Sequence, residues 1–343
     1  MKRERQHRQS IDAGQLIELI DGFERQRVAV FGDLIVDEFI YGEIARVSRE
    51  APVLILNYNA TEIVPGGAGN AAANVAALGG VPIIAGVVGR DEPGRRLLDG
   101  LKRRRADQAA IVRPAGYLTP TKTRILAGGV HSAKQQVVRI DRVSPPAIAP
   151  RDLAAIESRL LKAVGRCNAM LVSDYGTGLV TPRVVAAARQ RMKSGRPTLV
   201  DSRYSLLKFR GMTTCTPNES EVEQLFGIRI GDNTRVLERA GRELLTRTHA
   251  QAVLVTRGSR GMALFERERP TVHIPIHGSD QIADVTGAGD TVIATMTLAL
   301  AAGATFEEAA RLANYAGGIV VMKRGTATVS ADELRTAVLS DLD

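Results

Sequence analysis

Short apolar runs alternate with amphipathic segments along most of the chain. Buried parallel strands read as such runs, because both of their faces are covered; runs of this kind occupy residues 28–31, 82–87, 169–172, 198–200 and 252–255. Apolar residues at helical spacing predict helices between them; these segments are 13–23, 68–78, 95–104, 153–164, 184–192, 219–226, 236–246, 288–302, 305–321 and one from 331. The alternation predicts an α/β fold of three layers, α/β/α, with a mostly parallel central sheet.

Two segments break this pattern. Residues 38–64 are rich in Ile, Val, Tyr and Leu, with polar interruptions and Pro52, and predict two or three short strands. Residues 117–141 also predict strands, with a turn at Gly128-Gly129. Together they indicate a small antiparallel β lid inserted into one domain that spans residues 13–343. Residues 1–12 are predicted to be a disordered basic tail.

Composition narrows the function classes. The 343 residues carry a net charge of +9, which would suit a nucleic-acid partner or an enzyme that handles phosphates. The dense basic runs, 2–8 and 102–105, contain no interleaved aromatic residues, so we expect no nucleic-acid binding. Cys167 and Cys215 lie far apart and predict neither a zinc site nor a disulfide framework. Because the sequence shows no signal peptide and no run of about 20 apolar residues, we expect a cytoplasmic protein without a membrane span.

The segment Asp284-Val285-Thr286-Gly287-Ala288-Gly289-Asp290 carries the strongest chemical signal. It leads into an apolar helix, and a helix start offers unpaired N–H groups and a positive dipole end to an anion. A carboxylate beside a transferred phosphate would repel it unless it serves as the base for the attacking hydroxyl. Asp290 could equally be a helix cap, and this segment alone leaves the two interpretations even.

Three segments in order resemble the ribokinase (PfkB) family of carbohydrate kinases. The loop that ends at Asp290 is similar to the C-terminal signature of that family, and Pro65-Gly66-Gly67-Ala68-Gly69-Asn70 is similar to its N-terminal signature. Thr216-Pro217-Asn218-Glu219-Ser220-Glu221 resembles its metal and nucleotide segment. Within the family, stretches such as Ser173-Asp174-Tyr175 look like the kinase domain of the bifunctional heptose kinase/adenylyltransferase. That domain phosphorylates D-glycero-D-manno-heptose 7-phosphate at C1.

The resemblance implies a ribokinase-like fold, an ATP-dependent sugar kinase and a set of site residues. Asp290 would be the base, with Gly287, Ala288 and Gly289 around the transferred phosphate. The sugar or sugar phosphate would contact Asp33, Asp37, Gly66, Gly67, Asn70, Lys122, Arg124 and Arg139. ATP would contact Asn218, Glu221, Thr256, Gly258, Gly261 and Asn314. Mg²⁺ would be held near Glu221 and Asp174, and the resemblance admits a monovalent cation near residues 284–290. We also expect a homodimer through the lid.

Three positions depart from the heptose-kinase pattern. Thr177 stands where a Lys follows Ser-Asp-Tyr, Asp201-Ser202-Arg203 replaces Asp-Pro-Lys, and Gly69 replaces Ala. Two of these changes remove lysines near the edge that would handle phosphates, and Arg203 could compensate for one. The reaction is therefore better defined than the sugar. The alternatives are a family kinase for another sugar or nucleoside and a sugar-binding regulator without catalysis, although Asp290, Asn218 and Glu221 argue against the latter.

Overall fold

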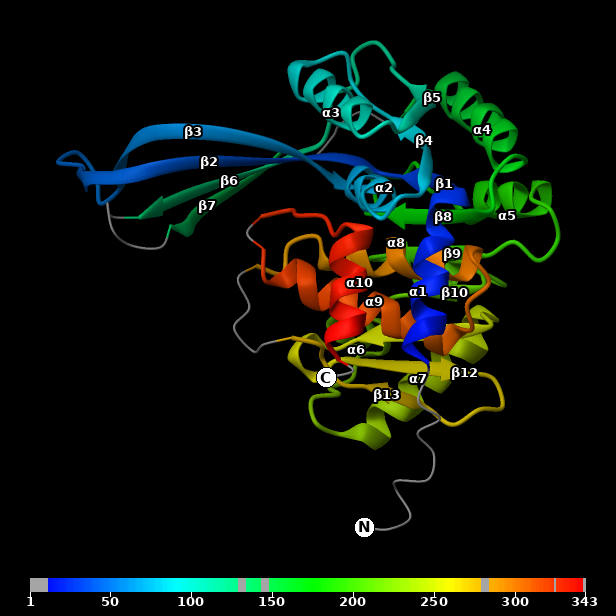
Figure 1. Ribbon diagram of the computed structural model, residues 1–343. Coiled ribbons are helices and arrows are strands. Elements are labelled where there is room, and N and C mark those ends of the chain that lie inside the picture. Colours follow the sequence, from blue (N-terminus) through cyan, green and yellow to red (C-terminus); the bar gives the residue numbers. More distant parts are fainter. Residues whose placement is uncertain (1–11, 129–133, 143–147, 279–283, 324, 342–343) are drawn as a thin grey trace.

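A nine-stranded sheet forms the middle layer of the structure, a computed structural model that describes residues 12–128, 134–142, 148–278, 284–323 and 325–341 (Figure 1). The predicted basic tail lies outside this range except for residue 12, and so does Gly129 of the predicted turn. The strand order is β13-β12-β11-β10-β9-β8-β1-β4-β5. The strands are β1 (Arg27–Gly32), β4 (Val81–Val87), β5 (Asp107–Val112), β8 (Ala169–Asp174), β9 (Thr198–Ser202), β10 (Thr214–Cys215), β11 (Ala252–Thr256), β12 (Met262–Glu266) and β13 (Val272–Ile274).

Helices cover both faces of this sheet because its strands are apolar on both sides. In β1, Val28 and Val30 pack into one core, whereas Ala29 and Phe31 pack into the other. The first core is closed by α1 (Ala13–Asp21), α2 (Ala68–Ala77), α3 (Glu92–Arg103), α8 (Ala288–Ala301), α9 (Phe306–Val321) and α10 (Ala331–Ser340). The second is closed by α4 (Pro150–Val164), α5 (Pro182–Arg191), α6 (Glu219–Phe226) and α7 (Thr234–Thr248). The predicted three-layer arrangement is confirmed.

The central sheet contains strands that the sequence prediction missed, at both edges and in its interior. Strands β5, β10, β12 and β13 were not predicted, and β12 and β13 pair antiparallel beyond β11. Gly261 makes this reversal possible: its φ is +74°, and a Cβ there would lie 2.1 Å from the Ile274 carbonyl oxygen. These strands are short, and their pairing depends on neighbours that the local pattern does not reveal.

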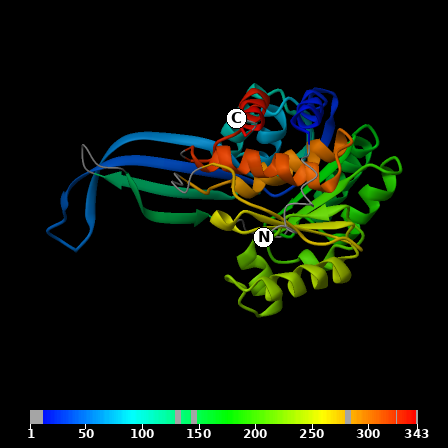
Figure 2. The same ribbon diagram turned by 60° about the horizontal axis from the view of Figure 1, so that its bottom comes forward.

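The lid is a separate four-stranded sheet that projects from the central layer (Figures 1 and 2). Its order is β3-β2-β6-β7, formed by β2 (Leu34–Val47), β3 (Leu54–Gly67), β6 (Thr121–Gly128) and β7 (Gln135–Arg142). The inserted β lid is present, but two details of the prediction were wrong. Short antiparallel strands were expected, whereas β2 and β3 are long and β2 pairs parallel with β6. The apolar residues 34–36 continue β1 so closely that the sequence pattern placed the start of the lid too late.

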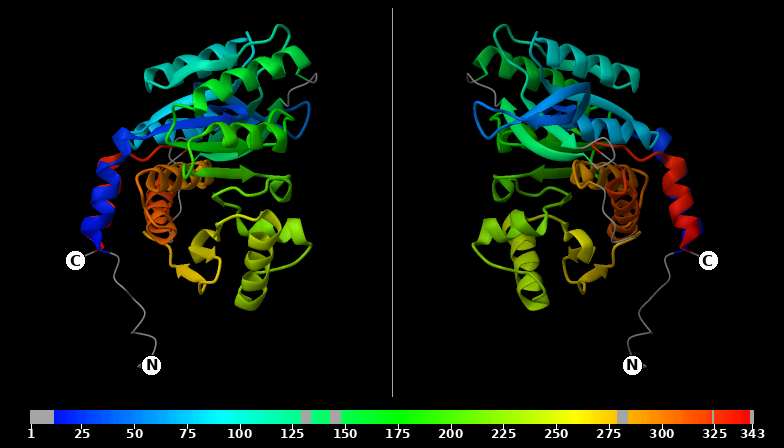
Figure 3. Two further views of the ribbon diagram at one scale, coloured as in Figure 1. Left: turned by 90° about the vertical axis from the view of Figure 1, so that its right-hand side faces the viewer. Right: turned by 90° about the vertical axis from the view of Figure 1, so that its left-hand side faces the viewer.

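The two ends of the described chain lie side by side. Helices α1 and α10 pack against each other on the outside of the first helical layer (Figure 3). Across the described ranges, every helix is too short or too polar to cross a membrane.

Candidate active site

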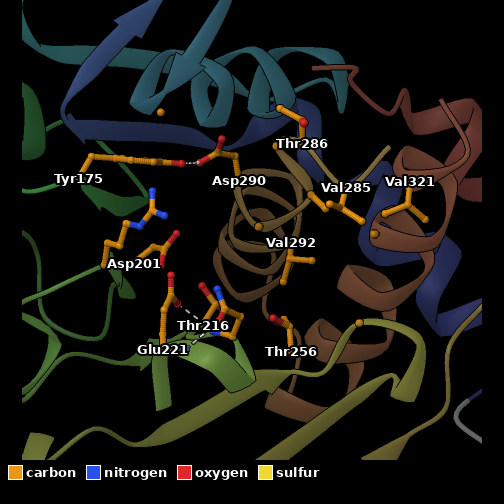
Figure 4. A pocket seen from close by; sticks show the side chains of 18 of the residues that line it. Tyr175, Asp201, Thr216, Glu221, Thr256, Val285, Thr286, Asp290, Val292 and Val321 are labelled. Carbon is orange, nitrogen blue, oxygen red and sulfur yellow. Dashed lines mark hydrogen bonds between the residues drawn. The ribbon is translucent and has the colours of Figure 1, made fainter. Parts of the chain in front are cut away.

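A cavity of about 670 Å³ lies between the base of the lid, the carboxyl ends of the central strands and the start of α8 (Figure 4). Most residues implied by the family resemblance line it: Asp37, Gly67, Lys122, Arg124, Arg139, Asp174, Asn218, Glu221, Thr256, Gly258, Gly261, Gly287, Ala288, Gly289, Asp290 and Asn314. Asp33, Gly66 and Asn70 are not in its wall. The fold therefore brings segments from the whole length of the chain to one cavity.

Asp290 lies in the first turn of α8 and is only 4% exposed. The Asn70 amide donates a hydrogen bond to Oδ2 of Asp290 at 2.9 Å. The Tyr175 hydroxyl donates to Oδ1 at 3.3 Å. Burial raises the pKa of Asp290 to about 7, and the bond from Asn70 opposes this rise. A carboxyl group poised near neutral pH suits a general base.

The orientation of the Asn70 side chain is fixed by a chain of amides between α2 and α8. Asn74 donates to the Asn70 Oδ1 at 3.2 Å and itself accepts a bond from the Thr291 hydroxyl at 3.1 Å. The Asn70 Oδ1 is thus occupied as an acceptor, and its NH₂ group faces Asp290. Gly287 leaves room for this group, since a Cβ there would lie 2.5 Å from the Asn70 Nδ2. Asn70 therefore acts on the carboxylate from behind the cavity wall.

The predicted cationic residues of the lid do reach the cavity, but they are not equivalent. Arg124 is engaged with Asp37 at 2.5 Å, and both side chains are largely buried. Gly66 allows Asp37 its position, because a Cβ there would lie 2.3 Å from an Asp37 carboxylate oxygen. Lys122 lies 4.9 Å above the Tyr175 ring, and burial lowers its pKa.

Arg139 lies on β7 and pairs with Asp141 at 2.9 Å, with half of its side chain exposed. An ion pair this open to solvent contributes little, so Arg139 can leave it to meet an anionic ligand.

Asp33 lies between β1 and β2, behind the wall rather than in it. One of its oxygens accepts a bond from the Tyr175 backbone N–H at 2.7 Å. Thr177 donates its hydroxyl to the other oxygen at 2.5 Å. Burial raises the Asp33 pKa. Both oxygens are thus engaged with the turn that follows β8, and a direct contact between Asp33 and a sugar hydroxyl stays a prediction that this placement does not favour.

The opposite wall of the cavity comes from the start of α6 and the ends of β10 and β11. The Asn218 side chain accepts a bond from the Glu221 N–H, and the Glu221 carboxylate accepts one from the Asn218 N–H, both at 2.9 Å. This reciprocal capping box fixes the helix start, and both residues also line the cavity. The hydroxyl of Thr216 is buried there without a partner among the described residues. An unpaired buried hydroxyl of this kind is costly unless a ligand meets it.

The rest of this wall is built largely from backbone. Gly258 has space beyond its Cα, and Gly261 cannot carry a side chain. Asn314 on α9 donates its amide to the Pro275 carbonyl at 2.9 Å and so ties α9 to the segment that follows β13. Because this part of the wall consists of glycines and backbone, few side chains fill the cavity beside Thr256.

A group of carboxylates faces the cavity between the two walls. Asp201 follows the predicted strand 198–200 and lies within β9. It was not proposed as a site residue, although its place after a predicted parallel strand was a signal. Desolvation raises its pKa well above the usual range, and the charges of Glu221, Asp290 and Asp174 add to this. Among the described residues no three such side chains are close enough to ligate an ion together. Clustered like charges of this kind nevertheless suit a cation that keeps most of its water, as Mg²⁺ does.

A helix start that presents glycine N–H groups and a buried carboxylate to a cavity closed by a lid is the arrangement of a ribokinase-like carbohydrate kinase. The profile of pfkB family carbohydrate kinases matches residues 25–333. The chain belongs to this family and is an ATP-dependent sugar kinase.

The sequence comparisons give more specific relatives. The chain is 43% identical over 310 residues to the bifunctional protein HldE of Geobacter sulfurreducens, which covers 89% of this chain and 61% of that protein. It is 39% identical over 329 residues to the bifunctional protein HldE of Caulobacter vibrioides, with 95% and 66% covered. The chain thus spans less than two thirds of the length of these relatives.

Solved structures share the fold at lower identity. Phosphofructokinase-2 from Escherichia coli in complex with potassium has a TM-score of 0.73 at 20% identity, with 93% of this chain and all of that one covered. Arabidopsis thaliana ribokinase complexed with ribose and ATP has a TM-score of 0.67 at 20% identity, with 93% and 99% covered. The ribokinase-like fold predicted from the sequence is confirmed.

Proposed function

We propose that the chain transfers the γ-phosphoryl group of ATP to C1 of D-glycero-D-manno-heptose 7-phosphate, with Asp290 as the general base. The observation that carries the proposal is the Asp290 carboxylate, which is buried at the start of α8 and has a pKa of about 7. It lines the cavity between the lid residues and the capping-box wall, so it lies between the two sides on which sugar and nucleotide would bind. The sugar hydroxyl would pass its proton to Asp290 as its oxygen attacks the γ-phosphorus and the bond to the β-phosphate oxygen breaks.

The start of α8 supports a role in charge stabilisation. Gly287 precedes the helix with φ of +80°, and Gly289 has nothing within 4 Å of the place where a Cβ would lie. The Ala288 N–H donates to the Val285 carbonyl at 3.2 Å. The Gly289 N–H belongs to the first turn, where a donor has no partner inside the helix. It can therefore donate to an oxygen of the transferred group as negative charge develops there.

The nucleotide would lie along the opposite wall. Thr256, Gly258, Gly261 and Asn314 border the slot for it, and the unpartnered Thr216 hydroxyl offers a donor to a phosphate oxygen. Mg²⁺, when bound with ATP, neutralises phosphate charge. Glu221, Asp174 and Asp201 would hold its water ligands, which fits their number and the raised pKa of Asp201. A monovalent cation near residues 284–290 stays a prediction.

The choice of a sugar phosphate rests on the cations of the lid and on the similarity to HldE proteins. Arg124 is engaged in a largely buried ion pair with Asp37. Among the described contacts, Lys122 and Arg139 have no such pair, so their side chains can bind a phosphate. Arg203 also lines the cavity and adds a further positive charge. Arginine suits phosphate because its planar fork donates two parallel bonds.

The test is a screen of ATP-dependent phosphorylation over heptose 7-phosphate, fructose 6-phosphate, fructose, ribose and a nucleoside, with ³¹P NMR of the product. We expect heptose 7-phosphate to give the highest kcat/KM and a new phosphate ester at C1. The Asp290→Asn variant should still bind ATP but lose turnover. Preference for an unphosphorylated sugar or a nucleoside would refute the proposed substrate, and undiminished turnover by the variant would refute the base.

We also propose that two copies pair through the lid. Large apolar side chains of the lid are exposed: Ile44, Val47, Leu54, Tyr58, Val137, Val138 and Ile140. Large apolar side chains gathered on one exposed sheet favour a role of the lid as an interface. Light scattering after gel filtration should give the mass of a dimer, and Val47→Glu should give a monomer. A monomeric mass for the unaltered chain would contradict this proposal.

A further inference from the structure

Tyr175 contacts the proposed base from the turn after β8. We infer that Tyr175 is a positioning residue for Asp290, and that Asp33 and Thr177 hold the turn that presents its hydroxyl. The inference rests on the proposed function only in taking Asp290 as the base. It assigns the buried Asp33 a task other than contact with the sugar.

The two oxygens of Asp290 are each held by one donor. Asn70 on α2 donates to Oδ2. Tyr175 donates to Oδ1 (Figure 4). Two donors on opposite oxygens set the plane of the carboxylate, which a single bond would leave free to rotate. A carboxylate has about four acceptor positions, so lone pairs remain for the proton of a sugar hydroxyl.

The ring of Tyr175 is fixed on both of its sides. Lys122 lies 4.9 Å from the ring centroid on the lid side. Gly67 lies against the ring edge, where a Cβ would come within 3.4 Å of Tyr175 and within 2.6 Å of the Asp33 carbonyl oxygen. The φ of Gly67 is +55°, a conformation that favours glycine. These contacts hold the ring with its hydroxyl on Asp290.

The backbone of Tyr175 is held by Asp33. Its N–H donates to Asp33 at 2.7 Å, and the Thr177 N–H donates to the same oxygen at 3.3 Å. The Thr177 hydroxyl bonds the other oxygen, so three donors of one short turn converge on one buried carboxylate. Gly176 between them has φ of +84°, which lets the turn close. Thr177 stands where the heptose-kinase pattern has a lysine, and here its hydroxyl serves this turn.

A purely structural Tyr175 would fill space, and Tyr175→Phe would then leave the chemistry unchanged. If Tyr175 is a positioning residue, Tyr175→Phe should lower kcat about tenfold, because it removes a hydrogen bond of ordinary strength to a charged group. KM for sugar and ATP should change by less than about twofold, since uniform binding is untouched. The acidic limb of the kcat profile should move to higher pH, because a bond that favours the carboxylate is lost. Asp37 and Lys122, which also face Asp290, stay in place.

Thr177 offers a graded test of the turn. Thr177→Val should lower kcat as Tyr175→Phe does. Thr177→Ser keeps the hydroxyl and should keep the kcat of the unaltered chain. The matched control is Tyr315→Phe, which removes a tyrosine–aspartate bond of 2.8 Å to Asp341 between two residues outside the cavity lining. It should leave kcat and its pH profile unchanged.

A measurement without turnover separates this inference from the proposed function. The Asp290 carboxyl can be titrated by NMR in protein labelled with ¹³C-aspartate, with the signal assigned through Asp290→Asn. Tyr175→Phe should raise the Asp290 pKa whichever sugar is the substrate, even if no tested sugar is phosphorylated. An unmoved titration, or a loss that appears only in KM, would overturn the role of Tyr175. Absence of sugar phosphorylation by the unaltered chain would overturn the proposed function alone.

Discussion

Replacing Asn70 by Ala should change the pH dependence of phosphoryl transfer. The Asn70 amide donates to Asp290 at 2.9 Å in a buried setting, and this bond stabilises the charged carboxylate. Hydrogen bonds to charged groups contribute about 1.5–3 kcal/mol, and one pKa unit corresponds to about 1.4 kcal/mol. The loss should therefore raise the Asp290 pKa from its value of about 7 by about one to two units.

The size of the effect at neutral pH follows from the ionised fraction. With a pKa of about 7, about half of the carboxyl groups are charged at pH 7. A rise of one to two units leaves about a tenth to a hundredth charged, so kcat should fall about five- to fiftyfold and recover toward pH 9. Asn70 touches the base from behind the wall, so KM should change little.

The assay is a coupled measurement of ADP release between pH 5.5 and 9.5 at saturating ATP and sugar. Asn59→Ala is the control, because Asn59 bonds Glu43 on the exposed lid. A variant whose acidic limb coincides with that of the unaltered chain would refute the reasoning. A uniform loss of activity at every pH would show that Asn70 acts on packing rather than on the charge of Asp290.

Three further changes test other parts of the site. The Asp290 pKa is raised on folding, so the folded state binds the proton more tightly and the free energy of unfolding falls as pH rises from about 4 to 7. In urea unfolding at pH 8, Asp290→Asn should therefore be more stable than the unaltered chain by about 2 kcal/mol or more. Equal stabilities at that pH would contradict the cost of burying the charged carboxylate. Thr216→Val should raise KM for ATP severalfold without loss of stability, because the hydroxyl has no described protein partner, and an unchanged KM would count against its contact with the nucleotide. Arg124→Ala leaves the buried Asp37 unpaired, so it should lower the free energy of unfolding by about 3 kcal/mol and reduce activity on every sugar. Arg139→Ala should reduce activity on phosphorylated sugars only. Similar behaviour of the two variants would contradict the different roles given to the two arginines.

The local sequence determined the elements of the core and the position of the chemistry. Continuous apolar runs predicted β1, β8 and β11. Strands that are covered on both faces carry apolar residues at successive positions, so they can be recognised from the sequence. The glycine-rich start of α8 and the start of α6 could be located in the same way, because helix starts need particular residues at fixed spacing. These features depend on neighbours within a few positions of the chain.

Other features depended on contacts between distant segments, and only the tertiary structure decided them. The length and mixed pairing of the lid strands depend on which edges meet, and the antiparallel pair β12 and β13 depends on β11 beside it. Asn70 meets Asp290 across 220 positions, and Asp33 meets Tyr175 across 142. The sequence identifies a carboxylate, but it does not reveal which groups will donate hydrogen bonds to it. The sequence could therefore name Asp290 and Asp33, whereas the fold alone places one at the cavity with a raised pKa and the other behind its wall.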